Sequence, residues 1–245
     1  MKHYLVLICV SLVFSSFGAK LPSVFIKCNR KQADFQQCLT KAVENAVRQM
    51  DHPFKEVGLL NLESLVIPEL TVSAGSRVFV AQQTLKNMTL SGFNETKCAK
   101  VEFDFDKNTL NLDCIVPHFR FDFSYEINGQ ILLVSIYGNG TGWVVMQDSH
   151  FELSYQLGEY EKKGKKYFNI NNHELKIQPR SIDFDLRNLF DGDEEAADRV
   201  KKILKDNALE IYKDIHSGYD AAFGKVFATI FERFLTKVPV SNLFD

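Results

Sequence analysis

The strongest constraint on the fold is one long amphipathic stretch near the C-terminus, residues 193–237. Apolar residues recur in it every three or four positions and no proline interrupts them, which is the pattern of an α-helix. Acidic residues at its start suit the positive end of the helix dipole, and Pro239 follows its last turn. The apolar stripe consists of Ala197, Val200, Leu204, Ala208, Ile211, Ile215, Tyr219, Ala222, Val226, Ile230 and Phe234.

The length of this helix limits the shape of the molecule. At about 1.5 Å per residue it would be roughly 67 Å long, whereas a compact sphere of this chain length would be only about 45 Å across. We therefore expect an elongated molecule or a bent helix, with Ser217-Gly218 as the bend, because Gly/Ser pairs are known kink sites. From Ala222 onward paired apolar residues widen the stripe, so the second half of the helix should be enclosed by a sheet.

The rest of the chain predicts one shorter helix and many strands. Residues 34–50 have an apolar face formed by Phe35, Leu39, Val43, Val47 and Met50, with Asp34 and Gln37 spaced like a capping box. Residues 54–186 then alternate between apolar and polar positions and turns, which is typical of antiparallel strands with one apolar face. Strands are predicted at residues 66–72, 77–81, 85–90, 101–105, 110–112, 119–125, 131–137, 151–157, 168–177 and 182–186.

A flat sheet of this many strands would have a larger apolar face than two helices can cover. We therefore expect the sheet to curl around the long helix. No break in composition separates a second domain. We therefore predict an α+β fold with a single domain over residues 20–245.

Residues 1–19 have the features of a secretory signal peptide: Lys2, an apolar run over residues 4–14, and the small residues Ser16 and Gly18. An N-terminal anchor is the alternative, but the run is short for a membrane span. We expect a secreted, extracellular protein without stable membrane insertion. Without the signal, 28 basic and 31 acidic residues give a net charge of −3 with His neutral. This charge gives no reason to expect nucleic acid or an anionic membrane as a partner.

Four cysteines remain after Cys9 leaves with the signal, an even number in an oxidising compartment. Of the three pairings, we predict the local one, Cys28 with Cys38 and Cys98 with Cys114. In a regular ladder across the hairpin of residues 101–112, however, Cys98 would lie on the polar face and Cys114 on the apolar face, and opposite faces cannot be bridged. A bulge, or a Cys98 placed just before the strand, removes this conflict; two buried free thiols are the alternative.

Three glycosylation sequons occur in the chain, at Asn87, Asn94 and Asn139, each near a predicted turn or strand end. In a secreted chain they predict at least one occupied site.

Several motifs together resemble the insect juvenile hormone-binding and takeout proteins, secreted carriers of hydrophobic small molecules. The resemblance covers nearly the whole mature chain. Its motifs are the pair Cys28 and Cys38, residues 65–70 (LVIPEL), residues 125–133 (YEINGQILL) running into Gly138-Asn-Gly, residues 189–193 (LFDGD) and residues 238–244 (VPVSNLF). It implies a long helix wrapped by a highly curved antiparallel sheet, the fold of tubular lipid-binding (TULIP-like) proteins, with an internal apolar pocket or tunnel.

Two positions depart from the takeout-like pattern: Asn207 is followed by Ala208 where such chains usually have Trp, and Ser217-Gly218 stands where they tend to have Pro. Cys98 and Cys114 are not placed like the second disulfide of the hormone binders, which favours the broader takeout-like branch.

A search for catalytic residues gives none. The Gly-x-Ser-x-Gly motif of hydrolases, which carries the nucleophilic serine, is absent. The histidines at positions 118, 150 and 173 belong to different predicted strands, and no second His follows His173 at the helical spacing that a zinc-binding helix needs. We expect no enzyme activity, no metal and no cofactor.

The chain contains 21 Phe and 8 Tyr. This abundance of aromatic residues is compatible with an apolar ligand pocket and equally with a well-filled core. If there is a cavity, its predicted lining is Tyr219, Phe223, Val226, Phe227 and Ile230 on the helix and Phe103, Phe105, Phe121, Phe123 and Leu153 on strands. Tyr219 is the expected hydrogen-bond partner that orients the ligand.

Two function classes follow. The first is a monomeric carrier of a small hydrophobic ligand, such as juvenile hormone, another terpenoid or a lipid. The alternative is an interaction protein with a filled core that contacts a receptor or secreted partner, for instance through the loop at residues 159–166.

Overall fold

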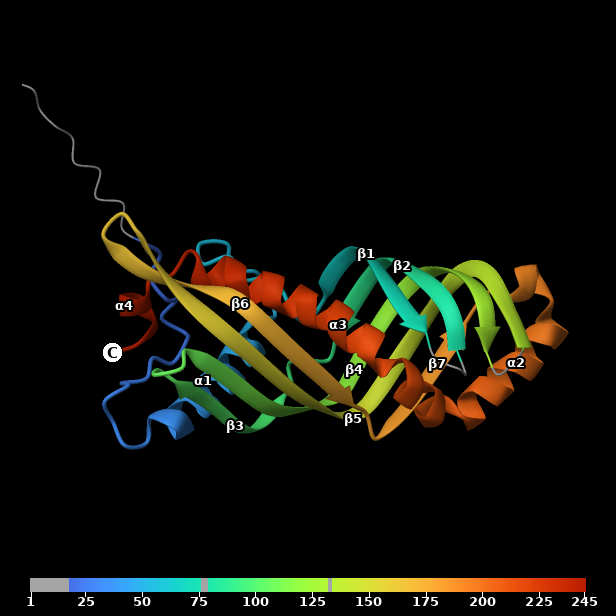
Figure 1. Ribbon diagram of the computed structural model, residues 1–245, viewed down its shortest axis with the longest axis horizontal. Coiled ribbons are helices and arrows are strands. Elements are labelled where there is room, and N and C mark those ends of the chain that lie inside the picture. Colours follow the sequence, from blue (N-terminus) through green and yellow to red (C-terminus); the bar gives the residue numbers. More distant parts are fainter. Residues whose placement is uncertain (1–17, 76–78, 132–133) are drawn as a thin grey trace, which may run out of the picture.

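The computed structural model describes residues 18–75, 79–131 and 134–245. A strongly curved antiparallel sheet and a long helix lie side by side along an elongated molecule (Figure 1). The predicted fold, a long C-terminal helix wrapped by a curved sheet with a short N-terminal helix, is confirmed. Nearly all of the expected signal peptide, residues 1–17, lies outside the described residues.

The described part of the sheet has seven strands, and two of them are long enough to organise the rest. β4 and β5 run antiparallel over 23 and 29 residues. β3 and β2 pair with successive parts of β4, while β6 and β7 pair with successive parts of β5. The strands are β1 (Leu65–Gly75), β2 (Phe79–Ser91), β3 (Lys97–Asp104), β4 (Thr109–Ile131), β5 (Val134–Lys162), β6 (Lys165–Gln178) and β7 (Ser181–Leu186).

The division of β4 and β5 into shorter predicted strands is wrong, because both strands run without a break through several glycines. Gly140 is one of them: a Cβ there would lie 1.9 Å from the carbonyl oxygen of Arg187. The chain leaving β7 continues beside β5 at this point, with an antiparallel bridge between Gly138 and Leu189, and the amide of Arg187 donates to the carbonyl of Thr141 at 2.8 Å. Glycine is therefore required for close approach, and no turn is formed.

The C-terminal stretch forms two helices, α2 (Glu194–Asp206) and α3 (Ala208–Leu235), so the prediction of one helix bent at Ser217-Gly218 is wrong. The break is at Asn207, whose backbone leaves the helical region and whose side-chain Nδ2 donates to the carbonyl of Ile203 at 2.8 Å. An amide side chain that bonds the preceding turn competes with the helix backbone, which explains the break. α2 covers one end of the sheet, while α3 runs along its length (Figure 1).

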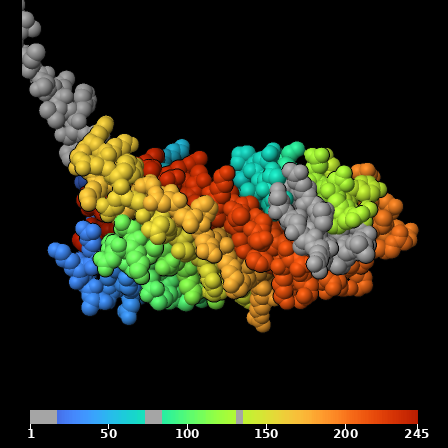
Figure 2. All heavy atoms as spheres, viewed as in Figure 1, coloured from blue at the N-terminus to red at the C-terminus, as the bar shows by residue number. Residues whose placement is uncertain are grey.

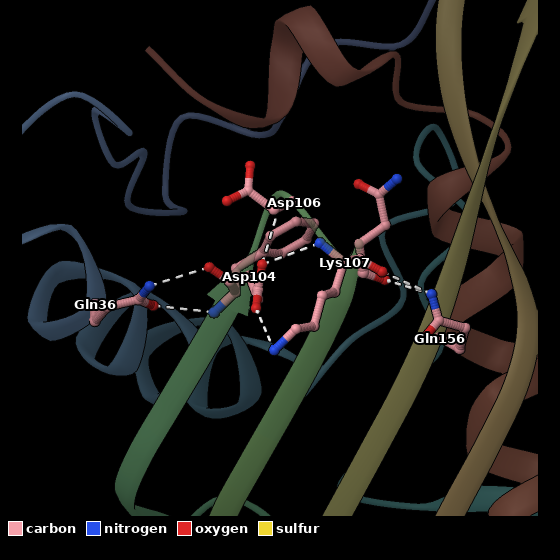
Figure 3. Close-up of polar contacts among 7 residues, drawn as sticks. Gln36, Asp104, Asp106, Lys107 and Gln156 are labelled. Atoms are coloured by element: carbon pink, nitrogen blue, oxygen red, sulfur yellow. Dashed lines mark hydrogen bonds and ion pairs between the residues drawn. The ribbon is translucent and has the colours of Figure 1, made fainter.

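The N-terminal helix α1 (Phe35–Gln49) agrees with the prediction, except that the side chain of Asp34 makes no capping hydrogen bond. Its polar side chains instead bond the free edge of β3. Gln36 donates to the carbonyl of Phe103 at 3.1 Å and accepts from its amide at 3.0 Å (Figure 3).

Two further side chains continue this row at four-residue spacing on the helix. Thr40 accepts from the amide of Val101 at 3.0 Å, and Glu44 accepts from the amide of Cys98 at 2.7 Å. α1 thus satisfies backbone groups that an edge strand would otherwise leave unpaired.

Both predicted disulfides are present, Cys28–Cys38 and Cys98–Cys114. The register of β3 against β4 shifts between Cys98 and Lys100, so that Cys98 lies directly opposite Cys114. A bulge is therefore what brings the two cysteines to the same face.

A short 3-10 helix, η1 (Phe190–Gly192), precedes α2. The last helix, α4 (Val240–Leu243), lies beside Ala19, whose carbonyl accepts from the side chain of Asn242 at 2.9 Å. The largest hydrophobic core lies between the sheet and α3, and a second one lies where α1, the β3–β4 hairpin and the C-terminus meet.

Candidate ligand-binding site

The space between the curved sheet and the helices contains a cavity of about 140 Å³ near the α2–α3 break, which we call the α2 cavity. Its walls come from β2, β4, β5, β7, α2 and α3 and are almost entirely aliphatic or aromatic. The lining residues are Leu85, Phe121, Phe123, Tyr125, Glu126, Ile127, Ile136, Val144, Met146, Ile182, Phe184, Leu186, Leu204, Ala208, Ile211, Tyr212, Ile215 and Tyr219.

A second cavity, of about 240 Å³, lies under α1 and is called the α1 cavity. No charged side chain of the described residues lines it. The lining residues are Val43, Val47, Met50, Leu59, Leu62, Phe93, Thr96, Cys98, Leu110, Leu112, Cys114, Val116, Phe151, Leu153, Tyr155, Phe227, Ile230 and Phe231.

An aromatic partition, formed by Phe119 and Phe223, stands between the two cavities. Both side chains are fully buried, and their rings pack 5.5 Å apart. Phe223 also contacts Phe121 of the α2 cavity at 5.6 Å and Phe227 of the α1 cavity at 6.3 Å. The described structure therefore has two adjoining chambers separated by one layer of rings.

The ten predicted lining residues fall into four groups. Phe121, Phe123 and Tyr219 line the α2 cavity, whereas Leu153, Phe227 and Ile230 line the α1 cavity. Phe223 belongs to the partition. Phe103, Phe105 and Val226 line neither cavity.

The three outliers have other environments. Phe103 and Phe105 pack in the second core, with Phe244 as a common neighbour. Val226 lines a surface groove between β1 and α3. In the space-filling view the outer side of α3 forms a strip of the surface between β6 and the β1–β2 pair (Figure 2).

Sequence reasoning missed two parts of the lining. One is the inner face of β7, where Ile182 and Phe184 reach the α2 cavity. The other is the apolar face of α1, where Val43 and Val47 cover the α1 cavity. The helical period of α1 identifies its buried face, but not that a cavity lies beneath it.

Tyrosine hydroxyls supply much of the polarity of the α2 cavity. Tyr125 donates to the carbonyl of Arg187 at 2.9 Å, and Tyr212 donates to the carbonyl of Ile177 at 3.2 Å. Burial, with a smaller contribution from Asp185, raises the pKa of Tyr125 to about 12. Burial likewise raises the pKa of Tyr212, so both groups stay protonated at neutral pH and remain hydrogen-bond donors.

The α1 cavity has two side-chain hydroxyls, on Thr96 and Tyr155. Thr96 donates to the carbonyl of Phe93 at 2.6 Å. Tyr155 is only 3% exposed, and burial raises the pKa of its hydroxyl. Its ring packs 5.0 Å from that of Phe231.

α3 is fixed to the edge of β6 by a pair of buried polar contacts at Ile177. The carboxylate of Asp220 accepts from the amide of Ile177 at 3.1 Å, while Tyr212 bonds its carbonyl. Nδ1 of His216 lies 2.7 Å from the second carboxylate oxygen of Asp220.

Burial raises the pKa of Asp220, and the hydrogen bonds from His216 and Ile177 only partly oppose this. The folded protein therefore binds the proton at this site more tightly than the unfolded chain. The resulting stabilisation is fully present below the unfolded Asp pKa of about 3.9 and is lost as pH rises through the folded value.

The three sequon asparagines, Asn87, Asn94 and Asn139, are all exposed. Within the described ranges no group of three or more His, Cys, Asp or Glu side chains is arranged to hold a metal ion. In the same ranges, no helix is long and apolar enough to cross a membrane.

The architecture defines a class of protein in which a curled antiparallel sheet and a long helix enclose apolar chambers. Takeout 1 of Epiphyas postvittana has the same fold: its crystal structure superposes with a TM-score of 0.75 at 21% identity, covering 89% of this chain and 99% of that one.

The haemolymph juvenile hormone binding protein family model matches residues 5–245. The chain therefore belongs to this family. Among characterised relatives, the circadian clock-controlled protein daywake of Drosophila melanogaster is 20% identical over 234 residues, covering 91% of this chain and 88% of daywake. Daywake of Drosophila yakuba is 20% identical over 240 residues, with the same coverage.

Proposed function

We propose that this protein is a secreted, monomeric carrier that holds a small hydrophobic ligand between its sheet and α3. The observation that carries the proposal is the α1 cavity, which is apolar, rich in aromatic side chains and free of charged groups. Pockets of this kind remove apolar ligands from water, and a few polar groups orient them. Membership of the juvenile hormone binding family supports the same role.

The carrier has no catalytic step in this proposal. Its ligand is juvenile hormone, another terpenoid or a lipid, and glycans at Asn87, Asn94 or Asn139 would sit on exposed side chains outside the cavities. In the α2 cavity Tyr219 remains our proposed orienting residue. Replacing Tyr219 by Phe should then weaken binding of a ligand that occupies this chamber, and unchanged affinity would remove the role.

The first test is native mass spectrometry of the secreted, enzymatically deglycosylated protein, followed by organic extraction. A near-stoichiometric apolar molecule is the expected result. A ligand-free protein that also fails to bind the fluorescent probe N-phenyl-1-naphthylamine would instead indicate a filled core and favour a surface-interaction role.

Two neighbouring positions on α1 provide a matched comparison. Val47 lines the α1 cavity and Arg48 is exposed. Val47→Trp should fill the chamber and reduce probe binding, while Arg48→Trp should leave it unchanged. Equal probe binding by both variants would place the probe elsewhere.

A further inference from the structure

The outer face of the sheet carries the single tryptophan of the chain, Trp143 on β5. Its neighbour Val144 lines the α2 cavity, and successive side chains of a strand point to opposite faces, so Trp143 points away from the cavity. It is half-buried there. Tryptophan is a residue of cores and interfaces, and its place on this face therefore calls for an explanation.

Two charged side chains of β4 hold the indole ring in place. The guanidinium carbon of Arg120 lies 5.1 Å from the centre of the Trp143 ring, a cation–π contact. Asp122, which pairs with Trp143 across the strands, accepts two hydrogen bonds from Arg120, at 2.7 and 2.5 Å. Asp122 takes only part of the five N–H donors of an arginine, and the side chain of Arg120 is 39% exposed. The group thus combines a fixed aromatic ring with polar atoms that a neighbouring molecule can reach.

The surface around this group is hollowed into a depression of about 400 Å³, which we call the Trp143 depression. Unlike the two cavities, it has a lining of mixed polarity. The lining residues are Asn87, Arg120, Asp122, Phe123, Ser124, Thr141, Gly142, Trp143 and Arg187. An aromatic ring beside guanidinium, carboxylate and hydroxyl groups suits a carbohydrate, because the C–H face of a sugar ring packs on the indole while its hydroxyls bond the polar groups.

A bulge in β2 turns Asn87 toward the outer face. The register of β2 against β4 shifts between Lys86 and Thr89, so two residues of β2 face one of β4. Met88 takes the inward position and is fully buried. Asn87 is exposed and has a φ of 50°, in the left-handed region that Asn adopts more readily than most residues. The bulge therefore places Asn87 in the lining of the Trp143 depression.

The position of Asn87 matters because it begins the sequon Asn87-Met88-Thr89. The other two sequon asparagines, Asn94 and Asn139, do not line the depression. In the sheet, β4 alone lies between β2 and β5, so Asn87 and Trp143 are roughly 10 Å apart, two strand spacings. Two linked sugar rings span a distance of this size. A glycan that starts at Asn87 can therefore reach the indole with its first sugars.

We propose that Asn87 carries an N-glycan whose first sugars pack along the outer face of the sheet against Trp143 and Arg120. Sugar rings cover the indole, while N-acetyl and hydroxyl groups bond Arg120 and Asp122. This inference rests on the proposed secretion, but not on any bound ligand. A glycan held in this way shields the outer face of β2, β4 and β5 from other proteins.

The test uses protein secreted by cultured insect cells, with the occupancy of each sequon measured by glycopeptide mass spectrometry. Because Trp143 is the single tryptophan, quenching of its fluorescence by acrylamide, a neutral molecule, reports on this site alone. Thr89→Ala removes the sequon and Thr89→Ser keeps it, and neither change replaces a lining residue. Thr89→Ala should be quenched about twice as strongly as Thr89→Ser, because the sugars that cover the ring are gone.

Two controls remove the other glycans. Asn94→Gln and Asn139→Gln should leave the quenching of Trp143 unchanged.

A second measurement is the rate at which peptide N-glycosidase F releases each glycan from the folded protein. Trp143→Leu should speed release at Asn87 about fivefold, the factor for one lost aromatic contact, without changing release at Asn94 or Asn139. Trp143→Phe keeps an aromatic ring and should stay close to wild type. A urea midpoint near that of wild type verifies that each variant is folded.

The remaining outcomes separate this inference from the carrier proposal. A secreted protein without a glycan at Asn87 overturns the inference, as does equal quenching of Thr89→Ala and Thr89→Ser. Equal acceleration at all three sequons in Trp143→Leu also overturns it, since that result indicates general loosening. A protein retained inside the cells refutes the proposed secretion and this inference with it. Binding of N-phenyl-1-naphthylamine tests the carrier function separately and should be the same in both Thr89 variants.

Discussion

Replacing Phe223 by alanine should join the two cavities. The side chain is 0% exposed and its ring lies between 5.5 and 6.3 Å from those of Phe119, Phe121, Tyr219 and Phe227. Truncation of a fully buried Phe costs about 3–5 kcal/mol, because transfer free energy is lost and a void remains. We expect a value near 4 kcal/mol, since rings on both sides are held by the sheet and α3 and cannot collapse into the space.

The functional consequence is a change in the ligand length that the protein accepts. Each methylene moved from water into an apolar chamber contributes about 0.8 kcal/mol, or roughly fourfold in affinity. For 1-alkanols, wild-type affinity should rise with length until the α1 cavity is full and then level off. In Phe223→Ala the rise should continue over several more methylenes, because the chain extends into the α2 cavity.

Urea unfolding measures the stability cost, and displacement of a fluorescent probe measures the length series. Phe168→Ala is the matched control: Phe168 is 1% exposed but packs in the second core, against Phe103. Phe168→Ala should lower the free energy of unfolding by a similar amount without changing the longest alkanol that still gains affinity. If Phe223→Ala keeps the wild-type limit while unfolding more easily, Phe223 is a core residue and does not divide the ligand space.

Three further predictions concern stability. Removing the Cys98–Cys114 disulfide with alanines should lower the free energy of unfolding by about 3 kcal/mol, the loop entropy for its 16-residue separation; a change below 1 kcal/mol in urea unfolding would contradict this. Asp220→Asn should gain stability relative to wild type as pH rises above about 4, the unfolded Asp pKa, because the raised Asp220 pKa makes wild type lose stability as pH rises; a difference in unfolding free energy that falls with pH would reverse the assignment. Gln36→Ala should cost about 1–3 kcal/mol and speed hydrogen exchange at the Phe103 amide, which it leaves unpaired; unchanged exchange there would show that water replaces the side chain.

Much of the fold is visible in local patterns. The period of the C-terminal apolar stripe predicts helix, and Asp193 at its start does cap α2, accepting from the amide of Ala196 at 3.0 Å. Alternation identifies the strands and which side chains face inward. The conflict between the faces of Cys98 and Cys114 pointed to a bulge, which the structure contains.

Other features depend on which neighbours meet in space. Asn207 and Gly218 are both weak helix formers. The break falls at Asn207, where the side chain bonds the carbonyl of Ile203 and where α2 turns across the end of the sheet while α3 runs along it. The same applies to Gly140, because only the fold shows that the carbonyl oxygen of Arg187 lies so close to it that no Cβ would fit.

The candidate site shows the limit of sequence most clearly. Phe103 and Phe121 occupy equivalent inward positions on neighbouring strands, yet Phe103 packs against other rings and Phe121 faces a chamber. By itself the sequence determined the helical and extended regions, most of their buried faces and the resemblance to the family, because period, spacing and residue type encode them locally. Only the tertiary structure decided where α2 turns away from α3, how far β4 and β5 continue, and where the core is left unfilled, because these follow from long-range packing that no local pattern records.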